Sequence, residues 1–262
     1  MSTPPLPLPL VDPAETTGSG CSVPDEFPAS YAEGAQRPES PDPASTALAA
    51  DLAHDLAIGD SPAVRDFFGP AYDAVFTFGT MLRDQGELRG LIGPREVSRL
   101  WERHLLNSAA LVAHLPEAGT LVDVGSGAGL PGIVVAAMRP ALEVILIEPM
   151  ERRTIWLTEV VEALGLTNVE IKRGRAEEYH GAFEADVVTA RAVANLAKLS
   201  RICLPLLRPG GEMVLLKGRN VAQEIDPARK ALRSLKATDP EIFEGHTISG
   251  IEPTTICRVR LR

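Results

Sequence analysis

The amino-acid sequence predicts an α/β fold in which a mostly parallel sheet is covered by helices on both faces and preceded by a helical segment. Two patterns lead to this class. From Thr120 onward, short β-branched runs alternate with helical stretches, and from Ser45 to Ala113 apolar residues recur at helical spacing. The chain has 262 residues, of which 45% are hydrophobic, so it is long and apolar enough to bury a substantial core.

The first 45 residues differ in composition from the rest. They hold 10 of the 22 prolines and seven acidic side chains against the single Arg37, and so carry −6 of the total charge of −9. Such a segment is predicted to be a disordered tail. The acidic balance argues against a protein held to nucleic acid by a diffuse basic surface. No apolar run approaches the roughly 18 residues of a membrane span, and early prolines interrupt any secretory signal.

Residues 46–115 are predicted to form a helical N-terminal cap. Its clearest segment runs from Glu96 to Val112, where one face is shared by residues at three- and four-residue steps: Val97, Trp101, His104, Ser108 and Leu111. A second stripe at four-residue spacing consists of Arg95, Arg99 and Arg103. On such a face, His104 is expected to be a hydrogen-bonded, partly buried histidine.

The alternating region is predicted to form five strands, four helices and a closing hairpin. The strands are expected at 120–124, 144–147, 169–172, 186–189 and 212–216. The helices are expected near 132–138, 152–164, 194–207 and 221–235. Helical crossovers between strands imply a mainly parallel sheet. The runs 241–249 and 254–260 have no helix between them, so they are predicted to pair as an antiparallel hairpin.

The most informative string runs from Leu121 to Gly132 and joins a buried strand to a glycine-rich turn that opens a helix. Its later glycines satisfy the dinucleotide pattern G-x-G-x-x-G, which leaves an NAD-dependent oxidoreductase open. The apolar run, however, ends at Val124, so the first turn reads D-x-G-x-G-x-G, with Asp123 at the end of the strand. Glu148, at the end of the next strand, is placed to accept hydrogen bonds from both ribose hydroxyls. This position supports the binding of a nucleotide but does not indicate which nucleotide is bound.

The D-x-G-x-G-x-G turn resembles motif I of class I S-adenosylmethionine (SAM) methyltransferases. More specifically, roughly residues 70–260 resemble the RsmG (GidB) family, the bacterial small-subunit rRNA guanine-N7 methyltransferases. The residues that carry this resemblance are 121–139, Arg175-Ala176-Glu177-Glu178, Thr189-Ala190-Arg191-Ala192, Leu215-Leu216-Lys217-Gly218 and Arg103-His104-Leu105-Leu106-Asn107-Ser108. The resemblance implies a seven-stranded class I fold over residues 116–262 and SAM-dependent methylation of a guanine N7 in 16S rRNA.

The resemblance also implies which residues contact SAM. In the family these positions correspond to Gly125, Leu130, Ala176, Glu177 and Arg191. Together with the glycine turn and the ribose acid, the expected cofactor residues also include Asp123, Gly127, Gly129 and Glu148. Arg191 ends an apolar strand at the edge where the methyl group should lie, and is expected to position the cofactor carboxylate or an RNA phosphate.

The reaction is expected to need no general base. Guanine N7 has a free lone pair and no proton to lose, so the enzyme must mainly hold it in line with the methyl carbon. Methyl transfer to an exocyclic amine usually goes with a [N/D]-P-P-[Y/F] motif after the fourth strand, and this sequence has none there. Transfer to a pyrimidine carbon needs a cysteine nucleophile, whereas Cys203 and Cys257 fall in predicted core elements. The histidines show no metal-ligand spacing, so no metal is expected.

The substrate is expected to be 16S rRNA, within the 30S subunit or its precursor, bound by a cytoplasmic monomer that does not contact a membrane. Candidate RNA contacts, beyond the cap arginines and the Lys172-Arg173-Arg175 cluster, are His104, Arg152, Arg153, Lys217 and Arg219. Besides the oxidoreductase, a second alternative is a noncatalytic SAM-fold protein that acts in ribosome assembly.

Overall fold

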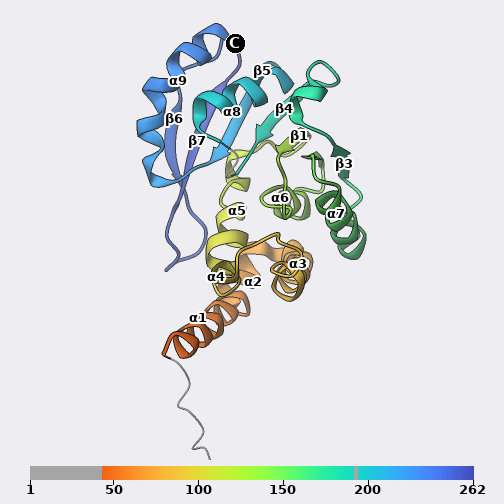
Figure 1. The fold of residues 1–262 in the computed structure, drawn as a ribbon, viewed down its shortest axis with the longest axis vertical. Helices are drawn as coiled ribbons and strands as arrows, with labels where there is room; N and C mark the ends of the chain where they lie inside the picture. Colours follow the sequence, from red (N-terminus) through yellow and green to blue (C-terminus); the bar gives the residue numbers. More distant parts are fainter. Residues whose placement is uncertain (1–42, 192–193) are drawn as a thin grey trace, which may run out of the picture. The chain divides into compact units, whose positions relative to one another are not determined.

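The computed structural model describes residues 43–191 and 194–262. The expected tail, residues 1–45, lies outside the described residues except for its last three. These begin helix α1 (Pro43–Gly59), the first of the helices that precede the sheet (Figure 1). Cys21 likewise lies outside the described residues. Within the two described ranges, no helix is both long enough and apolar enough to cross a lipid bilayer.

The sheet has seven strands in the order β3-β2-β1-β4-β5-β7-β6 (Figure 1). Their bounds are β1 Gly119–Val124, β2 Leu142–Glu148, β3 Val169–Arg173, β4 Ala185–Thr189, β5 Leu207–Leu216, β6 Glu241–Gly245 and β7 Thr254–Arg260. Strands β1 to β5 pair in parallel, whereas β7 pairs antiparallel with both β5 and β6. This arrangement confirms the predicted class I fold and its terminal hairpin. Strand β6 is shorter than expected, and residues 246–253 form the turn to β7.

Helices cover both faces of the sheet, because strand residues alternate between two buried faces. On one face, α6 (Gly132–Met138) and α7 (Glu151–Leu164) pack together with the N-terminal helices against side chains such as Leu121 and Leu146. On the other face, α8 (Leu196–Cys203) and α9 (Ala222–Ser234) pack against the strand residues that point the opposite way, such as Val122 and Ile145. The short 3-10 helices are η1 Gly69–Ala71, η3 Val112–His114, η4 Ala176–Tyr179, η5 Leu204–Leu206 and η6 Arg219–Val221.

The expected continuous helix from Glu96 to Val112 is instead broken into short pieces. After α2 (Pro62–Phe68) and α3 (Tyr72–Gln85), the chain forms α4 (Pro94–Val97), the π-helix η2 (Trp101–Leu106) and α5 (Asn107–Ala109). At the break, the carboxylate of Asp55 in α1 accepts the backbone N–H groups of Trp101 and Glu102, at 3.0 and 3.1 Å. Asp55, which lies 46 and 47 residues earlier, thus satisfies the first amides of η2 as an N-cap side chain would.

Asp123 joins the end of β1 to the start of α6. Its Oδ2 accepts the N–H of Gly132 at 3.0 Å, and its side chain is completely buried. Gly132 is required there, because a Cβ at this position would come within 2.7 Å of the same oxygen. The other carboxylate oxygen, Oδ1, has no hydrogen-bond partner among the described residues. Burial accordingly raises the pKa of Asp123 to about 7.

This raised pKa predicts a pH-dependent stability in the ligand-free protein. Between about pH 4 and pH 7 the folded chain holds a proton on Asp123 that the unfolded chain has released. The free energy of unfolding should therefore fall as pH rises through this window. Asp123→Asn cannot titrate, so its loss of stability between pH 5 and pH 7.5 should be smaller than that of the wild type by about 2 kcal/mol.

The measurement is urea denaturation at the two pH values, with Asp73→Asn on an exposed face of α3 as the matched control. The control should keep the wild-type pH dependence. An Asp123→Asn protein with the same pH dependence as the wild type would contradict the assignment of the buried proton to this carboxyl group.

Candidate active site

The glycine turn lies at the carboxyl end of β1 and is fixed by hydrogen bonds to the end of β2. The N–H groups of Gly125 and Ser126 both donate to the carbonyl oxygen of Ile147, at 2.8 and 3.1 Å. Gly125 and Gly127 adopt positive φ values of 70° and 55°, a conformation that glycine adopts without strain. The turn is thus held open at the edge where doubly wound sheets bind their ligands.

Glu148 is the central acid of this edge. It is almost fully buried, and each of its carboxylate oxygens accepts one backbone N–H at 2.9 Å: Oε2 from Gly127 and Oε1 from Met150. A carboxylate oxygen has two lone pairs, so each oxygen retains the capacity to accept a hydroxyl donor. Arg153 lies nearby, with Nη1 3.8 Å from Oε2 of Glu148.

A cavity of about 500 Å³ opens above this turn, a size usual for small-molecule sites. The glycine turn, Glu148 and Arg191 all contribute to its lining. Among the predicted cofactor and RNA residues, those that line it are Gly125, Gly127, Leu130, Glu148, Arg153, His104 and Arg191. The structure therefore brings together residues from four separate parts of the sequence.

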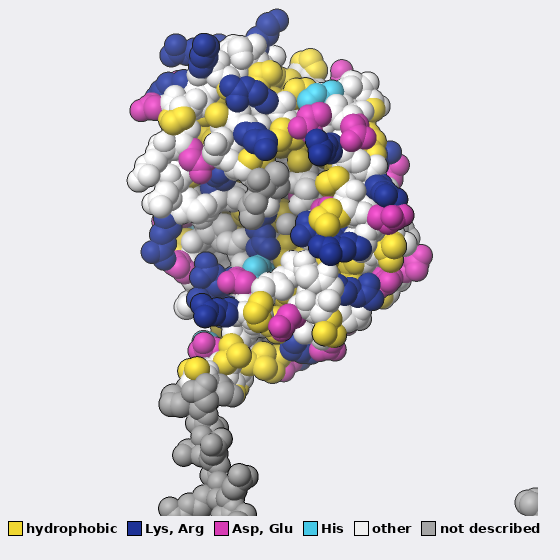
Figure 2. Space-filling model, in the orientation of Figure 1, with side chains coloured by type: hydrophobic (Ala, Val, Ile, Leu, Met, Phe, Trp, Pro, Cys, Tyr) yellow, Lys and Arg dark blue, Asp and Glu magenta, His cyan; other side chains and the backbone are white. Residues whose placement is uncertain are grey.

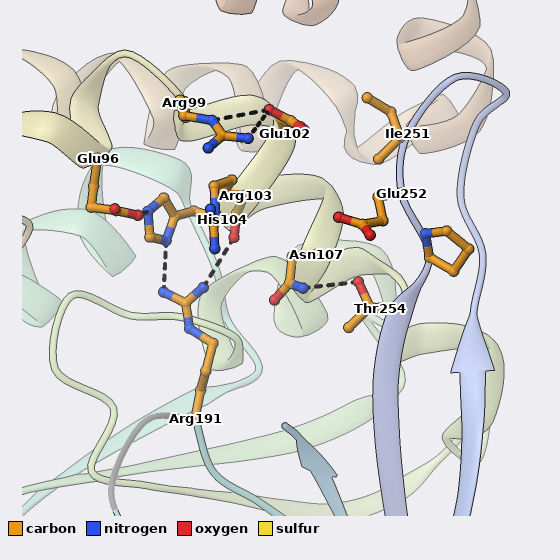
Figure 3. Close-up of a pocket in the computed structure, with 11 residues that line it drawn as sticks. Glu96, Arg99, Glu102, Arg103, His104, Asn107, Arg191, Ile251, Glu252 and Thr254 are labelled. Carbon is orange, nitrogen blue, oxygen red and sulfur yellow. Dashed lines mark hydrogen bonds and ion pairs between the residues drawn. The ribbon is translucent and has the colours of Figure 1, made fainter. Parts of the chain in front are cut away.

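Arg191 is attached to the N-terminal helices by two hydrogen bonds (Figure 3). Its Nη2 donates to Nδ1 of His104 at 2.9 Å, and its Nη1 donates to the carbonyl oxygen of Arg103 at 3.4 Å. Beyond the end of β4, the backbone of Arg191 forms an isolated parallel β-bridge with Leu216, the last residue of β5. Arg191 thus spans from the sheet edge to the π-helix η2.

The contact with Arg191 determines the protonation of His104. A guanidinium only donates, so Nδ1 of His104 must accept, and its proton lies on Nε2. This Nε2 donates to Oε2 of Glu96 at 2.9 Å. Burial, reinforced by the charge of Arg191, lowers the pKa of His104 to about 4, so the imidazole is neutral near pH 7. One tautomer of His104 therefore satisfies both of its neighbours in the chain Glu96–His104–Arg191.

A second cavity, of about 330 Å³, adjoins the first at this chain. It is bordered by η2 and by the turn before β7 (Figure 3). Glu96, His104 and Arg191 line both cavities, so their hydrogen-bonded side chains form a wall that the two cavities share. Figure 2 shows the corresponding face, where Lys and Arg side chains surround a hollow. The arrangement suits two ligands that meet at a shared boundary.

Apart from the cap arginines, the remaining predicted cofactor and RNA residues do not line either cavity. Gly129 packs against the core, where a Cβ would come within 2.7 Å of Ile133. Ala176 is buried and Glu177 exposed in η4, which follows β3. The ammonium of Lys217 contacts Glu224 at 2.7 Å and a backbone carbonyl at 3.2 Å, and its side chain is only 9% exposed.

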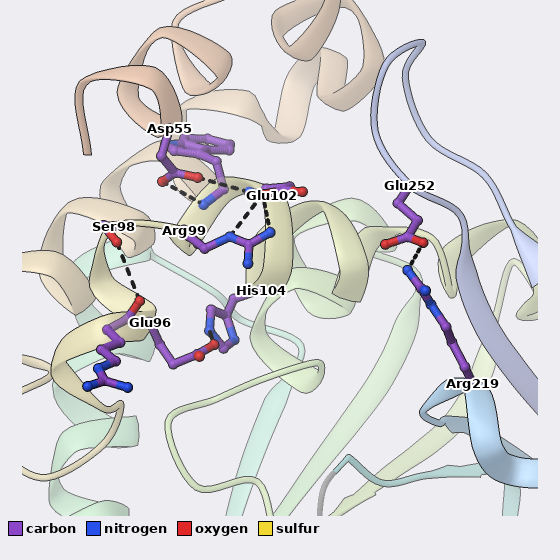
Figure 4. Close-up of polar contacts among 10 residues, drawn as sticks. Asp55, Glu96, Ser98, Arg99, Glu102, His104, Arg219 and Glu252 are labelled. Atoms are coloured by element: carbon purple, nitrogen blue, oxygen red, sulfur yellow. Dashed lines mark hydrogen bonds and ion pairs between the residues drawn. The ribbon is translucent and has the colours of Figure 1, made fainter. Parts of the chain in front are cut away.

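Two further predicted RNA contacts are exposed. Arg152 lies at the start of α7. Arg219 follows β5 and pairs with Glu252 of the turn before β7 (Figure 4). Among the described residues, no cluster of three or more histidine, cysteine, aspartate or glutamate side chains could hold a metal ion.

Sequence reasoning missed three acids that organise this region: Asp55, Glu96 and Glu102. Glu96 and His104 are eight residues apart, which on a regular helix places them about 80° from one another around the axis. Their contact depends on the break before η2, which no local pattern indicates. At that break Asp55 accepts two backbone amides (Figure 4), and no local sequence pattern indicates these contacts, because Asp55 lies in an earlier helix.

Comparison with known proteins places this geometry in a family. The model of the GidB family, rRNA small subunit methyltransferase G, matches residues 72–248. The ribosomal RNA small subunit methyltransferase G of Pseudarthrobacter chlorophenolicus is 46% identical over 205 residues, covering 78% of this chain and 95% of that protein. The protein of the same name from Streptomyces coelicolor is 50% identical over 200 residues, covering 75% and 83%. The counterpart from Thermobifida fusca is 48% identical over 202 residues, covering 76% and 84%. The chain therefore belongs to the rRNA small subunit methyltransferase G family.

Proposed function

We propose that this protein transfers a methyl group from SAM to N7 of a guanine in 16S rRNA of the small ribosomal subunit. The observation that carries the proposal is the pair of cavities that share the Glu96–His104–Arg191 wall. One is built from the glycine turn and the ribose acid, which suits a nucleoside cofactor. The other is polar and open to solvent, which suits a base presented by an RNA. The family supplies the reaction class.

The residues around the first cavity fit SAM. Gly125 and Gly127 offer bare backbone, and Leu130 offers an apolar contact. Glu148 would accept the ribose hydroxyls, and Arg191 would face the carboxylate. Nε of Arg153, which also lines this cavity, is buried without a hydrogen-bond partner among the described residues, so a donor remains for a polar ligand. Ala176 and Glu177, at the end of β3, are proposed to contact the adenine. Asp123 and Gly129 act beneath the turn and hold its shape.

The chemistry requires positioning rather than proton transfer. When bound, SAM supplies a methyl group attached to a positively charged sulfur. The lone pair of N7 forms the new bond to the carbon of this methyl group, and the electrons of the broken C–S bond stay on sulfur. The base gains the positive charge and loses no proton, so no residue has to act as a base. Neutral His104 holds the Arg191 guanidinium at the boundary of the two cavities. Burial raises the pKa of the Cys203 thiol and raises that of Cys257 to about 11, which disfavours a cysteine nucleophile.

The RNA is proposed to bind over the second cavity, with its phosphates near exposed arginines such as Arg103, Arg152 and Arg219. His104 and Arg153 lie deeper, at the cavities. Lys217 is instead assigned a structural role, because its ammonium is held by Glu224. Since the chain has a net charge of −9, its affinity should come from a shaped target rather than from bulk electrostatics. We propose a cytoplasmic monomer that acts on the 30S subunit or its precursor.

The cofactor assignment predicts a specific loss of SAM affinity in Glu148→Gln. The amide keeps the size of the side chain but removes the charge and one acceptor, so SAM should bind about ten- to a hundredfold more weakly. Isothermal titration calorimetry with SAM, S-adenosylhomocysteine and NADH measures this. Glu143→Gln, at an exposed position of the same strand, should bind SAM like the wild type. Micromolar binding of NADH by the wild type without binding of SAM would instead favour the oxidoreductase.

The proposed reaction predicts that Arg191→Ala abolishes most methylation while the protein stays folded. The gene is deleted in its host, and 16S rRNA is probed for N7-methylguanosine by borohydride reduction and aniline cleavage. Cleavage at one guanine should disappear on deletion and return with the wild-type gene. With Arg191→Ala, initial rates in vitro should fall at least about a hundredfold, with only a small change in melting temperature.

Two outcomes would count against this assignment. If deletion leaves the N7-methylguanosine pattern unchanged, the noncatalytic alternative becomes the better account. If Arg191→Ala loses thermal stability and activity in parallel, the arginine has a structural role rather than a positioning one.

A further inference from the structure

The second cavity has a chemical character of its own, which the cofactor does not explain. Its walls come from η2 on one side and from the turn before β7 on the other (Figure 3). Acidic and basic side chains both line it, and Asn107 donates to Thr254, another lining residue, at 2.8 Å. Of its acids and arginines, Arg99 and Glu102 pair with one another, whereas Glu96 bonds to His104 and Glu252 bonds to Arg219, which lies outside the lining. Such a lining suits a planar ligand that carries both donors and acceptors.

We propose that the second cavity binds the target guanine after it leaves the RNA stack, and that Glu102 recognises the Watson–Crick edge of that base. This inference rests on the proposed function, because it requires N7 of the base to face the cofactor cavity. Enzymes that modify a base commonly extrude it into a pocket and read this edge by hydrogen bonds. Guanine presents two donors there, N1–H and the 2-amino group, for which a carboxylate is the matching acceptor.

The orientation of the base follows from the wall that the two cavities share. N7 must point toward this wall, and the adjacent O6 atom, an acceptor, then lies beside Arg191. Two of the five N–H groups of Arg191 are used, by His104 and by the carbonyl of Arg103, so others remain for O6. With N7 and O6 at the wall, the two donors of the Watson–Crick edge, N1–H and the 2-amino group, are left free, and we assign them to Glu102 in the same lining.

Glu102 is better prepared for this contact than the other acids. Arg99 donates through both Nε and Nη2 to one oxygen of Glu102, Oε2, at 3.2 and 2.9 Å (Figure 4). In the described part of the chain no hydrogen bond reaches the other oxygen, Oε1. The backbone N–H of Glu102 is fixed by buried Asp55. Glu252, by contrast, lies on an exposed turn and pairs with exposed Arg219. Glu96 is bonded to His104 in the wall itself.

The charge of Glu102 should matter most during the reaction. Methylation at N7 makes the purine positively charged, and its N1–H becomes a stronger donor as that charge develops. A hydrogen bond from N1–H to a carboxylate therefore strengthens in the transition state, which raises kcat rather than affinity alone. Adenine lacks both donors and offers an acceptor at N1, so it would leave the carboxylate unpaired and be rejected.

The test uses the full-length protein and 30S subunits that lack the modification. In Glu102→Gln, kcat should fall about ten- to a hundredfold, while SAM binding by calorimetry and the melting temperature stay unchanged. Glu117→Gln, an exposed acid outside both cavities, serves as the matched control. A second readout is NMR titration of the wild type, in the presence of S-adenosylhomocysteine, with 5′-GMP and with 5′-IMP, which lacks the 2-amino group. GMP should bind at least about tenfold more tightly than IMP, and Glu102→Gln should remove this difference.

The outcomes separate this inference from the proposed function. If the wild type places no N7-methylguanosine in the subunits, the proposed function fails. If the wild type methylates normally but Glu102→Gln retains its kcat, Glu102 is not the reader. The inference is also overturned if Glu252→Gln alone produces the loss, or if the wild type binds GMP and IMP equally or binds neither. The nucleotide titration of the wild type remains decisive even if Glu102→Gln does not fold.

Discussion

The hydrogen-bonded chain Glu96–His104–Arg191 is the interaction on which the organisation of the site depends. It joins the end of β4 to the N-terminal helices through a histidine whose two nitrogens are both used, at 2.9 Å each. Because His104 is buried and neutral, a single tautomer satisfies both neighbours. The same three side chains line both cavities. A methyl donor in one cavity and a nucleophile in the other would therefore meet where the cavities adjoin, beside side chains that the protein has already ordered.

This boundary is supported from two directions. On the sheet side, the glycine turn is fixed by Ile147, Glu148 and the buried Asp123. On the helical side, Asp55 of α1 binds the first amides of the π-helix, and Trp101 packs among the aromatic rings of Phe68, Tyr72 and Phe76. π-Helical turns such as η2 often occur at functional sites. Here the π-helix presents Glu102 and His104 toward the cavities while its apolar side chains remain in the core.

The sequence was sufficient to predict the elements that depend on local patterns. Strand alternation, the glycine turn and Glu148 follow from short-range rules, and the structure places each near its expected position. The base-binding side was not predictable in the same way. The contact between Glu96 and His104 requires the helix break at which Asp55 accepts two amides, and the hydrogen bond of Arg191 with His104 joins residues 87 positions apart. Lys217 shows the converse: its motif resembles a substrate contact, but Glu224, seven residues later, binds its ammonium.

The central claim is that the two cavities hold the two reactants next to one another, where the cavities adjoin at Arg191. A crystal structure of the protein with S-adenosylhomocysteine and 5′-GMP tests it most directly. We predict the ribose of S-adenosylhomocysteine at Glu148, its sulfur near Arg191, and the purine in the second cavity with N7 toward that sulfur. The claim would be contradicted if the purine lay outside the second cavity, or if S-adenosylhomocysteine were bound away from the glycine turn.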